Sequence, residues 1–310
     1  MVTLVRANNP SPMTLTGTNS YVVDCGAGEA LVIDPGPRLP AHIAALIETA
    51  AAKSLRIRAI AVTHGHPDHA PGAADLAAAT RALVFAHPRS RIKRDADLPL
   101  GGELRAGTTA LTVMDAPGHA ADHAVFYLPA ERILFTGDVI VGEGTVVISP
   151  PGGEMRDYQR TLALLLERFG DAAAIYGGHG PIVTDARAKI QEYISHRELR
   201  ERQVLDALRE GPMTILDIVR RVYGPKRSVL WPVMARQMLA HLQALEAEGR
   251  VSAPFASPEA TAEEIAILNP SLEELVGPEE AAVLAAELGT ELRIDALPAY
   301  RLVPGAEPGS

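Results

Sequence analysis

The stretch Thr63–His69, which reads THGHPDH, limits the fold of this chain more than any other feature. It follows the apolar run IRAIAV and contains three histidines and one aspartate, namely His64, His66, Asp68 and His69. Such side chains at the end of a buried strand need partners, because unpaired polar groups are costly to bury. Side chains two positions apart in an extended segment point the same way, so His64 and His66 can reach one cation. Asp68 and His69 lie on the following turn and can reach a second cation, and this mixture of imidazole and carboxylate suits Zn²⁺.

Further metal ligands are expected at the ends of later strands. Three candidates follow apolar runs and stand beside glycine: His119 in APGH, Asp138 in FTGD and His179 in GGHG. Glycine lets the backbone and a metal ion approach each other closely. Each residue taken alone is more typical of an ordinary turn, but the ordered set predicts a metal site.

The first 185 residues alternate short strand-like runs with helical segments. Examples are the strands SYVVD and ALVID and the amphipathic helix HIAALIETAAA. Strands and helices in this order are typical of a layered α/β fold. The sequence therefore predicts one α/β domain over residues 1–185.

Residues 186–310 have a different character. A long charged helix and two further helical stretches precede two short strand-like runs, RVSAP and AYRLVP. Between these runs, residues 255–298 contain ten acidic residues and a single basic one, Arg293. The pattern predicts a small helical domain over residues 186–310, closed by a β-ribbon that carries an acidic insertion at about 255–298.

The motif H-x-H-x-D-H at His64–His69, followed by His119, Asp138 and His179, resembles the metallo-β-lactamase superfamily. Three segments are similar to its β-lactamase-like protein 2 group in particular: NNPSPMTLTGTNSYVV, SHRELRERQVL and AHLQALEAEGRV. The resemblance to the superfamily covers about residues 1–185 and implies an αββα sandwich with metal ions at one edge, between two sheets. The resemblance to the group implies that a winged-helix-like C-terminal domain follows.

The resemblance also implies how the ligands are shared between two Zn²⁺ ions, for which Mn²⁺ or Fe²⁺ are alternatives. Three histidines would hold the first ion: His64, His66 and His119. Three further side chains would hold the second ion: Asp68, His69 and His179. Asp138 would bridge the two ions, an arrangement close to the glyoxalase II pattern. Asp34 in VIDPG and the neighbouring Thr63 would support the ligands without binding metal themselves.

Two divalent cations that share a water lower its pKa towards about 7, so hydroxide is available at neutral pH. We therefore expect a binuclear-zinc hydrolase whose metal-bridging hydroxide attacks a small acyl substrate, such as a thioester, ester, lactone or β-lactam. Asp68 is expected to be catalytic, by steering the water or carrying a proton. Thr18 and Asn19, in the loop TGTN, are expected to bind substrate, with an ordinary turn as the alternative.

Other activities use the same types of ligand. One is a metal-dependent endoribonuclease acting on single-stranded RNA, and another is a mononuclear-iron oxygenase. A binding module built on the helical domain is a third alternative. The formal net charge of −9 disfavours nucleic acid as a partner, because protein surfaces that bind nucleic acid are usually basic. Aromatic residues make up 4% of the chain, which is few for stacking on single-stranded bases.

The remaining features concern location and the other histidines. The sequence lacks both a signal-peptide pattern and an apolar run of about 18 residues that could span a membrane. Cys25 is the only cysteine, which favours a reducing, cytoplasmic location. The helical domain is compatible with a homodimer. His123 is expected to support the site or face solvent rather than bind metal. Four histidines are expected to be surface or packing residues: His42, His87, His196 and His241.

Overall fold

The computed structural model describes residues 1–224, 231–253 and 299–304. The acidic insertion predicted at about 255–298 lies outside the described residues. The chain divides into two compact units, of which the first comprises Met1–Val146 and Arg160–Tyr193. The second comprises Val147–Gln159 and Ile194–Ser310. The domain boundary at residues 185/186 stays a prediction.

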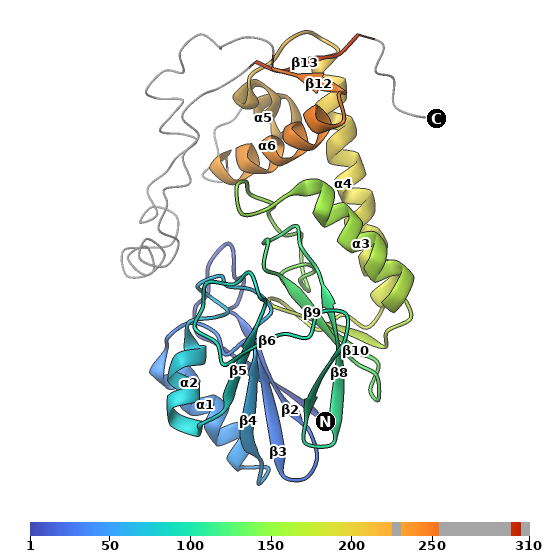
Figure 1. The fold of residues 1–310 in the computed structure, drawn as a ribbon. Coiled ribbons are helices and arrows are strands. Elements are labelled where there is room, and N and C mark those ends of the chain that lie inside the picture. The colour runs from blue at the N-terminus through green and yellow to red at the C-terminus, as the bar shows by residue number, and fades with distance from the viewer. Residues whose placement is uncertain (225–230, 254–298, 305–310) are drawn as a thin grey trace. The chain divides into compact units, whose positions relative to one another are not determined.

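The first sheet has six strands, which lie side by side in chain order (Figure 1). Their bounds are Val2–Arg6 (β1), Asn19–Asp24 (β2), Glu29–Ile33 (β3), Arg56–Ala61 (β4), Leu83–Ala86 (β5) and Ala96–Asp97 (β6). The pairs β1–β2 and β2–β3 are antiparallel, whereas β3 to β6 run parallel to one another. As a result, β3, β4 and β5 all end at the same edge of this sheet.

The second sheet has five strands in the order β11-β10-β9-β8-β7. Their bounds are Glu103–Ala106 (β7), Thr109–Asp115 (β8), Ala124–Leu128 (β9), Ile133–Gly137 (β10) and Ala174–Gly177 (β11). The strands β7 to β10 pair antiparallel, but β10 and β11 pair in parallel. The loops that follow β10 and β11 therefore leave the sheet at one common edge.

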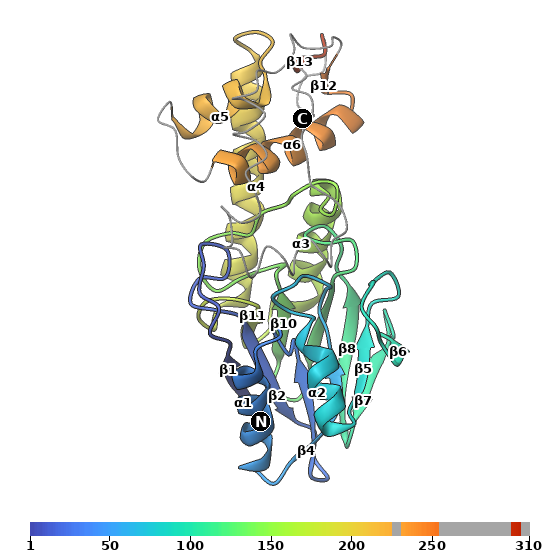
Figure 2. The same cartoon turned by 90° about the vertical axis from the view of Figure 1, so that its left-hand side faces the viewer.

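An apolar core fills the space between the two sheets. Its buried side chains come from both of them, for example Leu31 and Ile33 from β3, Phe126 from β9 and Phe135 from β10. A second apolar cluster joins the other face of the first sheet to two helices, α1 (Pro40–Ala51) and α2 (Gly72–Thr80). Figure 2 shows both helices on this outer face.

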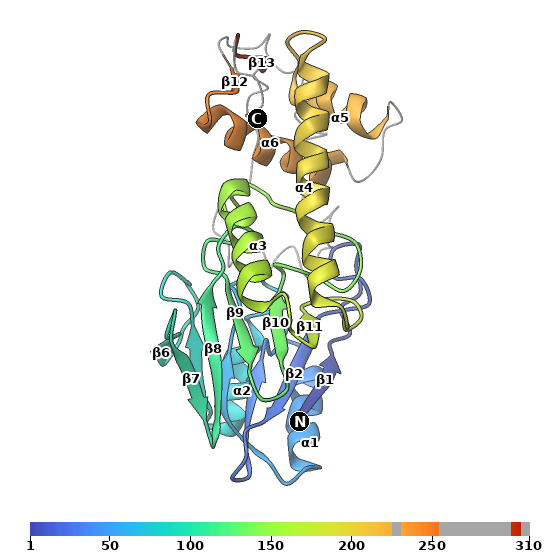
Figure 3. The same cartoon turned by 90° about the vertical axis from the view of Figure 1, so that its right-hand side faces the viewer.

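Two longer helices supply the outer layer of the second sheet. They are α3 (Met155–Phe169) and α4 (Ala186–Leu208), and both begin or end in the first unit (Figure 3). The ring centre of Phe169 in α3 lies 4.7 Å from that of Tyr127 in β9. The hydroxyl of Tyr193 in α4 accepts a hydrogen bond from the N–H of Val141 at 3.0 Å. Two stacked sheets between helices form the αββα sandwich that was predicted.

The second unit contains a helical module closed by a short ribbon. Its helices α5 (Ile215–Tyr223) and α6 (Trp231–Ala247) share an apolar core with α4. The strand β12 (Val251–Ser252) pairs antiparallel with β13 (Arg301–Leu302), as the sequence pattern indicated. None of the helices in the described part of the chain is long and apolar enough to cross a membrane.

Arg197 of α4 joins three segments of the second unit through buried contacts. Its guanidinium lies 5.1 Å from the ring centre of Tyr158, and its Nη1 donates a hydrogen bond to Oε1 of Gln237 at 3.2 Å. The same oxygen accepts a hydrogen bond from the N–H of Ile148 at 3.1 Å. These contacts offset part of the cost of burying a charged side chain. They also hold residues 147–159 against the helical module.

Buried His42 of α1 gives the first unit a pH-dependent stability. Its Nε2 lies 2.8 Å from Oγ of Ser20 in β2, and burial lowers its pKa to about 4. The folded chain therefore keeps this imidazole neutral, while the unfolded chain protonates it below about pH 6.5. Since the unfolded state binds the extra proton, the free energy of unfolding should fall by about 3 kcal/mol as the pH decreases from about 6.5 to about 4.

We expect His42→Gln to remove this contribution. Hydrogen exchange of α1 and β2 in a urea series measures the free energy of unfolding at about pH 7 and about pH 4.5. Between these two pH values, the wild-type free energy of unfolding should fall by about 2 to 3 kcal/mol more than that of the variant. The control Ser20→Ala keeps the buried imidazole and should retain the wild-type pH dependence. An equal loss in wild type and His42→Gln would contradict the prediction.

Candidate metal centre

Three histidines from two loops converge at the sheet edge where β4 ends. His64 and His66 follow β4, and His119 lies in the loop between β8 and β9. Each offers one ring nitrogen, and these nitrogens lie within 4.8 Å of one another. In particular, Nε2 of His119 is 3.1 Å from Nδ1 of His66. The structure thus brings together the three residues that were assigned to the first ion.

Four further side chains converge beside them, namely Asp68, His69, Asp138 and His179. Their ligand atoms also lie within 4.8 Å of one another. Nε2 of His179 is 3.0 Å from Oδ2 of Asp68, and Nε2 of His69 is 3.3 Å from Oδ1 of Asp138. They come from the loops after β4, β10 and β11, which the two sheets place at one edge.

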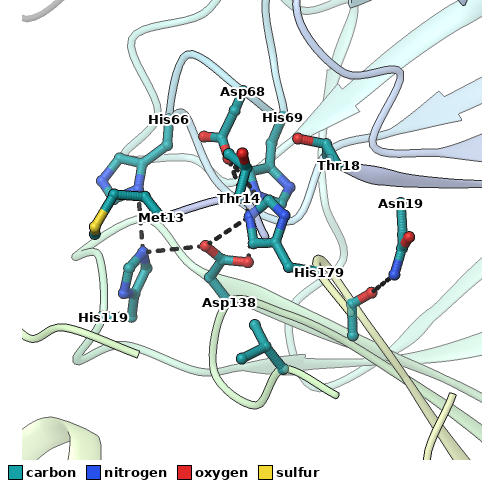
Figure 4. Close-up of polar contacts among 12 residues, drawn as sticks. Met13, Thr14, Thr18, Asn19, His66, Asp68, His69, His119, Asp138 and His179 are labelled. Carbon is teal, nitrogen blue, oxygen red and sulfur yellow. Dashed lines mark hydrogen bonds and ion pairs between the residues drawn. The ribbon is translucent and has the colours of Figure 1, made fainter. Parts of the chain in front are cut away.

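The carboxylate of Asp138 lies between the two groups (Figure 4). Its Oδ2 is 3.4 Å from Nε2 of His179 in one group and 3.9 Å from Nε2 of His119 in the other. A carboxylate in this position can offer one oxygen to each of two ions. The bridging role of Asp138 stays a prediction, and the carboxylate lies where that role requires it.

Several buried polar atoms of the site fit a bound cation. Nε2 of His64, Nε2 of His69 and Oδ1 of Asp138 are buried and have no hydrogen-bond partner within the described residues. Buried polar atoms without a partner are costly, and coordination of a metal would supply the missing interaction. Nitrogen and oxygen donors of these types suit zinc, manganese and iron. The cluster is thus a site for divalent metal.

Asp34 orients the ligands of the β4 loop. Its Oδ2 accepts hydrogen bonds from Nδ1 of His69 at 2.9 Å and from Oγ1 of Thr63 at 2.8 Å, and its Oδ1 accepts one from the N–H of Thr63 at 2.7 Å. Oγ1 of Thr63 also lies 3.0 Å from Nδ1 of His64. A bond that occupies Nδ1 fixes the ring and leaves Nε2 for a metal. That Asp34 and Thr63 support metal ligands stays a prediction.

The two ligand groups differ in charge. Burial opposes ionisation of Asp138, but the imidazoles of His179 and His69 outweigh it and hold the pKa of Asp138 well below its usual range. Burial likewise opposes the imidazolium of His179, yet mainly the Asp138 carboxylate, with help from Asp68, raises its pKa to about 10. For His64, burial and the surrounding imidazoles lower the pKa well below 6.5. In the group of three histidines, His64 is thus a neutral imidazole. In the group of four, the Asp138 carboxylate is ionised and faces an imidazolium, His179.

Thr18 and Asn19 hold the turn that carries His179. Both side chains are completely buried. Nδ2 of Asn19 donates hydrogen bonds to the carbonyl oxygens of Gly177 at 3.1 Å and Gly180 at 2.9 Å, and Thr18 pairs with His179 in an isolated β-bridge. These contacts tie both residues to the turn that carries His179. The role of Thr18 and Asn19 in binding substrate stays a prediction.

Gly178 shows why glycine stands beside the ligands. A Cβ atom at this position would overlap Oδ1 of Asp138 and Cε1 of His69. Any side chain here would push the β11 turn away from the site. Close approach of the backbone therefore requires glycine.

His123 is a residue of the site whose role the sequence did not settle. It is completely buried, its ring stacks on that of His64 with centroids 4.5 Å apart, and its Nε2 accepts a hydrogen bond from the N–H of Asp138 at 3.1 Å. It does not face solvent, and it touches one member of each ligand group. Its position directly before the apolar strand β9 was the available signal, because the other site residues also flank strand ends.

Replacing His123 with leucine is expected to weaken zinc binding about 10- to 100-fold, the usual effect of losing a residue that orients ligands. Leucine leaves the N–H of Asp138 buried without its acceptor. His123→Gln, whose Oε1 can take the place of Nε2, should recover part of the affinity. Competition with a chromogenic chelator measures the change.

His241→Gln is the matched control for this experiment. His241 is also a buried histidine, but it lies in α6 of the second unit. This variant should bind zinc as wild type does. Wild-type affinity in His123→Leu would show that His123 does not orient the ligands.

Two stacked sheets between helices, with histidines and carboxylates gathered at one edge, define a metal-dependent hydrolase. Residues 13–179 match the metallo-beta-lactamase superfamily, and residues 214–254 match the beta-lactamase associated winged helix domain. The chain belongs to the metallo-beta-lactamase superfamily, and a winged-helix domain follows its hydrolase domain.

Individual relatives agree with this assignment. A beta-lactamase-like protein 2 homolog from Caenorhabditis elegans is 35% identical over 234 residues, which cover 72% of this chain and 76% of that protein. The atrochrysone carboxyl ACP thioesterase of Aspergillus chevalieri is 34% identical over 237 residues, 72% of this chain and 73% of that protein. The crystal structure of a metallo-beta-lactamase family protein from Thermus thermophilus superposes with a TM-score of 0.67 at 25% identity, over 81% of this chain and 95% of that one. The predicted resemblance to the β-lactamase-like protein 2 group is confirmed.

Proposed function

We propose that this protein is a binuclear-zinc hydrolase of small acyl substrates, and that thioesters are its preferred class. The observation that carries the proposal is the pair of ligand groups that share one carboxylate. Oδ2 of Asp138 lies 3.4 Å from His179 in one group and 3.9 Å from His119 in the other. One ion would be held by His64, His66 and His119, and the other by Asp68, His69 and His179, with Asp138 between them.

When bound, two zinc ions would lower the pKa of a shared water and polarise the acyl oxygen. The chain's own residues fix the geometry of this reaction. Asp34 holds His69 through Nδ1, and His123 holds the backbone of Asp138, so that the ligands keep their positions. Asp68 is a carboxylate in contact with His179 that is also partly exposed, and it is suited to orient the attacking water or accept its proton.

The choice of thioesters rests on the chemistry named for one relative. The Aspergillus chevalieri protein is an ACP thioesterase, and its match covers 72% of this chain. Esters, lactones and β-lactams present the same electrophilic carbonyl and remain in the proposed substrate class. Cleavage of single-stranded RNA and iron-dependent oxygenation are the competing activities, and each would produce a different result below.

A metal analysis combined with a substrate panel tests the proposal. We expect about two zinc ions per chain, as hydrolysis by a pair of metal ions requires, and turnover of an acyl thioester that stops with chelator and returns with zinc. About one iron per chain, with oxygen consumption, would identify an oxygenase instead. Cleavage of labelled single-stranded RNA without thioester turnover would overturn the acyl-substrate proposal in favour of a nuclease.

A further inference from the structure

The segment after β5, residues 87–94, lies against the predicted metal loops. β5 is parallel to β4, so this segment leaves the sheet at the same edge as Thr63–His69. Oγ of Ser90 lies 3.2 Å from the place a Cβ on Gly65 would occupy, and Gly65 stands between two predicted ligands. Ser90 is 7% exposed, and its Oγ has no hydrogen-bond partner among the described residues. The segment is therefore packed directly onto the H-x-H motif.

A second set of contacts fixes the segment to the loop that carries His119. Nε2 of His87 lies 3.1 Å from Oδ1 of Asp115, the last residue of β8. Nη2 of Arg89 donates to both oxygens of the same carboxylate, at 3.2 and 3.3 Å. The segment is thus held from two sides, by the loop after β4 and by the end of β8.

This segment is also basic in a chain that is acidic overall. It contains four cations, Arg89, Arg91, Lys93 and Arg94, whereas the whole chain has 29 basic and 38 acidic residues. Two of the four are engaged, because Arg89 pairs with Asp115 and Arg94 pairs with Asp97.

The other two cations are available to a ligand. Arg91 and Lys93 are exposed, and neither forms a hydrogen bond or ion pair with the described residues. The nearest acidic residue in sequence, Asp95, has its Oδ2 occupied by the N–H of Val84 at 2.8 Å. Two exposed cations on a segment that is packed against a predicted metal loop attract anions, and guanidinium and ammonium groups both bind phosphate.

We propose that Arg91 and Lys93 bind the phosphate-bearing arm of the substrate's thiol portion, so that the enzyme prefers phosphopantetheine-linked acyl thioesters to neutral ones. This inference rests on the proposed thioesterase function and adds its specificity. The same phosphate chemistry occurs in acyl-coenzyme A and in an acyl group carried on a carrier protein. Residues 87–94 would hold the arm while the thioester carbonyl reaches the metal centre.

A comparison of charged and neutral substrates tests the proposal. The probes are an acyl-coenzyme A, the same acyl group on a phosphopantetheinylated carrier protein, and its neutral N-acetylcysteamine thioester. In the double variant Arg91→Gln/Lys93→Gln, the ratio of kcat/KM for the coenzyme A substrate to that for the neutral substrate should fall about tenfold, mainly through KM. The same measurement with the carrier-protein substrate then shows whether kcat/KM falls more for coenzyme A or for the carrier protein.

The matched control removes two exposed cations from the opposite edge of the sheet. Lys53→Gln/Arg56→Gln changes the charge by the same amount just before and at the start of β4, and its substrate ratio should equal that of wild type. As a second measurement, added salt should raise KM for the coenzyme A substrate in wild type and do so less in the Arg91/Lys93 variant.

The outcomes separate this inference from the function on which it rests. If no thioester is turned over, charged or neutral, the proposed function fails. If thioesters are turned over but the substrate ratio is the same in wild type and the Arg91/Lys93 variant, the recognition role is overturned. Loss of RNA binding in that variant, with an unchanged thioester ratio, would also overturn it and would assign the two cations to nucleic acid.

Discussion

Asp138→Ala is expected to lower kcat by about a thousandfold and to reduce the bound metal from about two ions per chain to about one. The carboxylate of Asp138 lies between the ligand groups, 3.4 Å from Nε2 of His179 and 3.9 Å from Nε2 of His119. Removing it would take a negative charge and a shared ligand from the two proposed ions. A loss of about 4 kcal/mol of transition-state stabilisation corresponds to the thousandfold effect.

Elemental analysis of the purified variant and thioester turnover at saturating zinc measure these two effects. Asp171→Ala is the control, because Asp171 is an exposed carboxylate of the first unit that pairs with Arg132. It should keep wild-type metal content and turnover. Two bound ions and full turnover in Asp138→Ala would rule out a bridging carboxylate.

Asp68→Asn is expected to lower kcat by about a hundredfold to ten-thousandfold, the range usual for losing a positioned acid or base. Oδ2 of Asp68 lies 3.0 Å from Nε2 of His179, and its side chain is 17% exposed, so it touches the ligand group and also reaches solvent. Asparagine keeps the shape of the side chain but can neither carry the charge nor accept a proton.

Metal content separates the two roles of Asp68. A variant with two ions and a low kcat would assign Asp68 to proton transfer or to orientation of water. A variant with one ion would assign it mainly to coordination. Asp75→Asn, at an exposed carboxylate of α2 that pairs with Arg38, is the control and should behave as wild type. Full turnover in Asp68→Asn would contradict both roles.

Several elements of the fold could be predicted because their local patterns are strong. The apolar runs SYVVD, ALVID and IRAIAV correspond to the strands β2, β3 and β4, and the helices α1 and α4 show the composition expected of helices. The strands β1, β6 and β7 were not predicted. β6 has two residues, β7 has four, and β1 is an edge strand with only partly buried side chains, so none carries a pronounced apolar pattern.

The same distinction applies to the site. Metal-ligand chemistry restricts residue types so strongly that all the candidate ligands could be named from the chain. Residues without such chemistry could not be assigned a role in this way. Thr18 and Asn19 are buried and contact the turn of His179, and their role in binding substrate stays a prediction. His123 was expected to support the site or face solvent, and it is buried against one member of each ligand group.

By itself, the sequence determined which side chains could bind metal, in which order they follow the strands, and that a helical domain comes after them. Only the tertiary structure decided that His66 meets His119 across 53 residues of chain, that Asp138 lies between the two groups, and that the basic segment after β5 lies beside the H-x-H motif. The physical reason is that strand ends and ligand types follow from local patterns of a few residues. The distances between loops are set instead by the parallel pairing within each sheet and by the apolar core that stacks one sheet on the other.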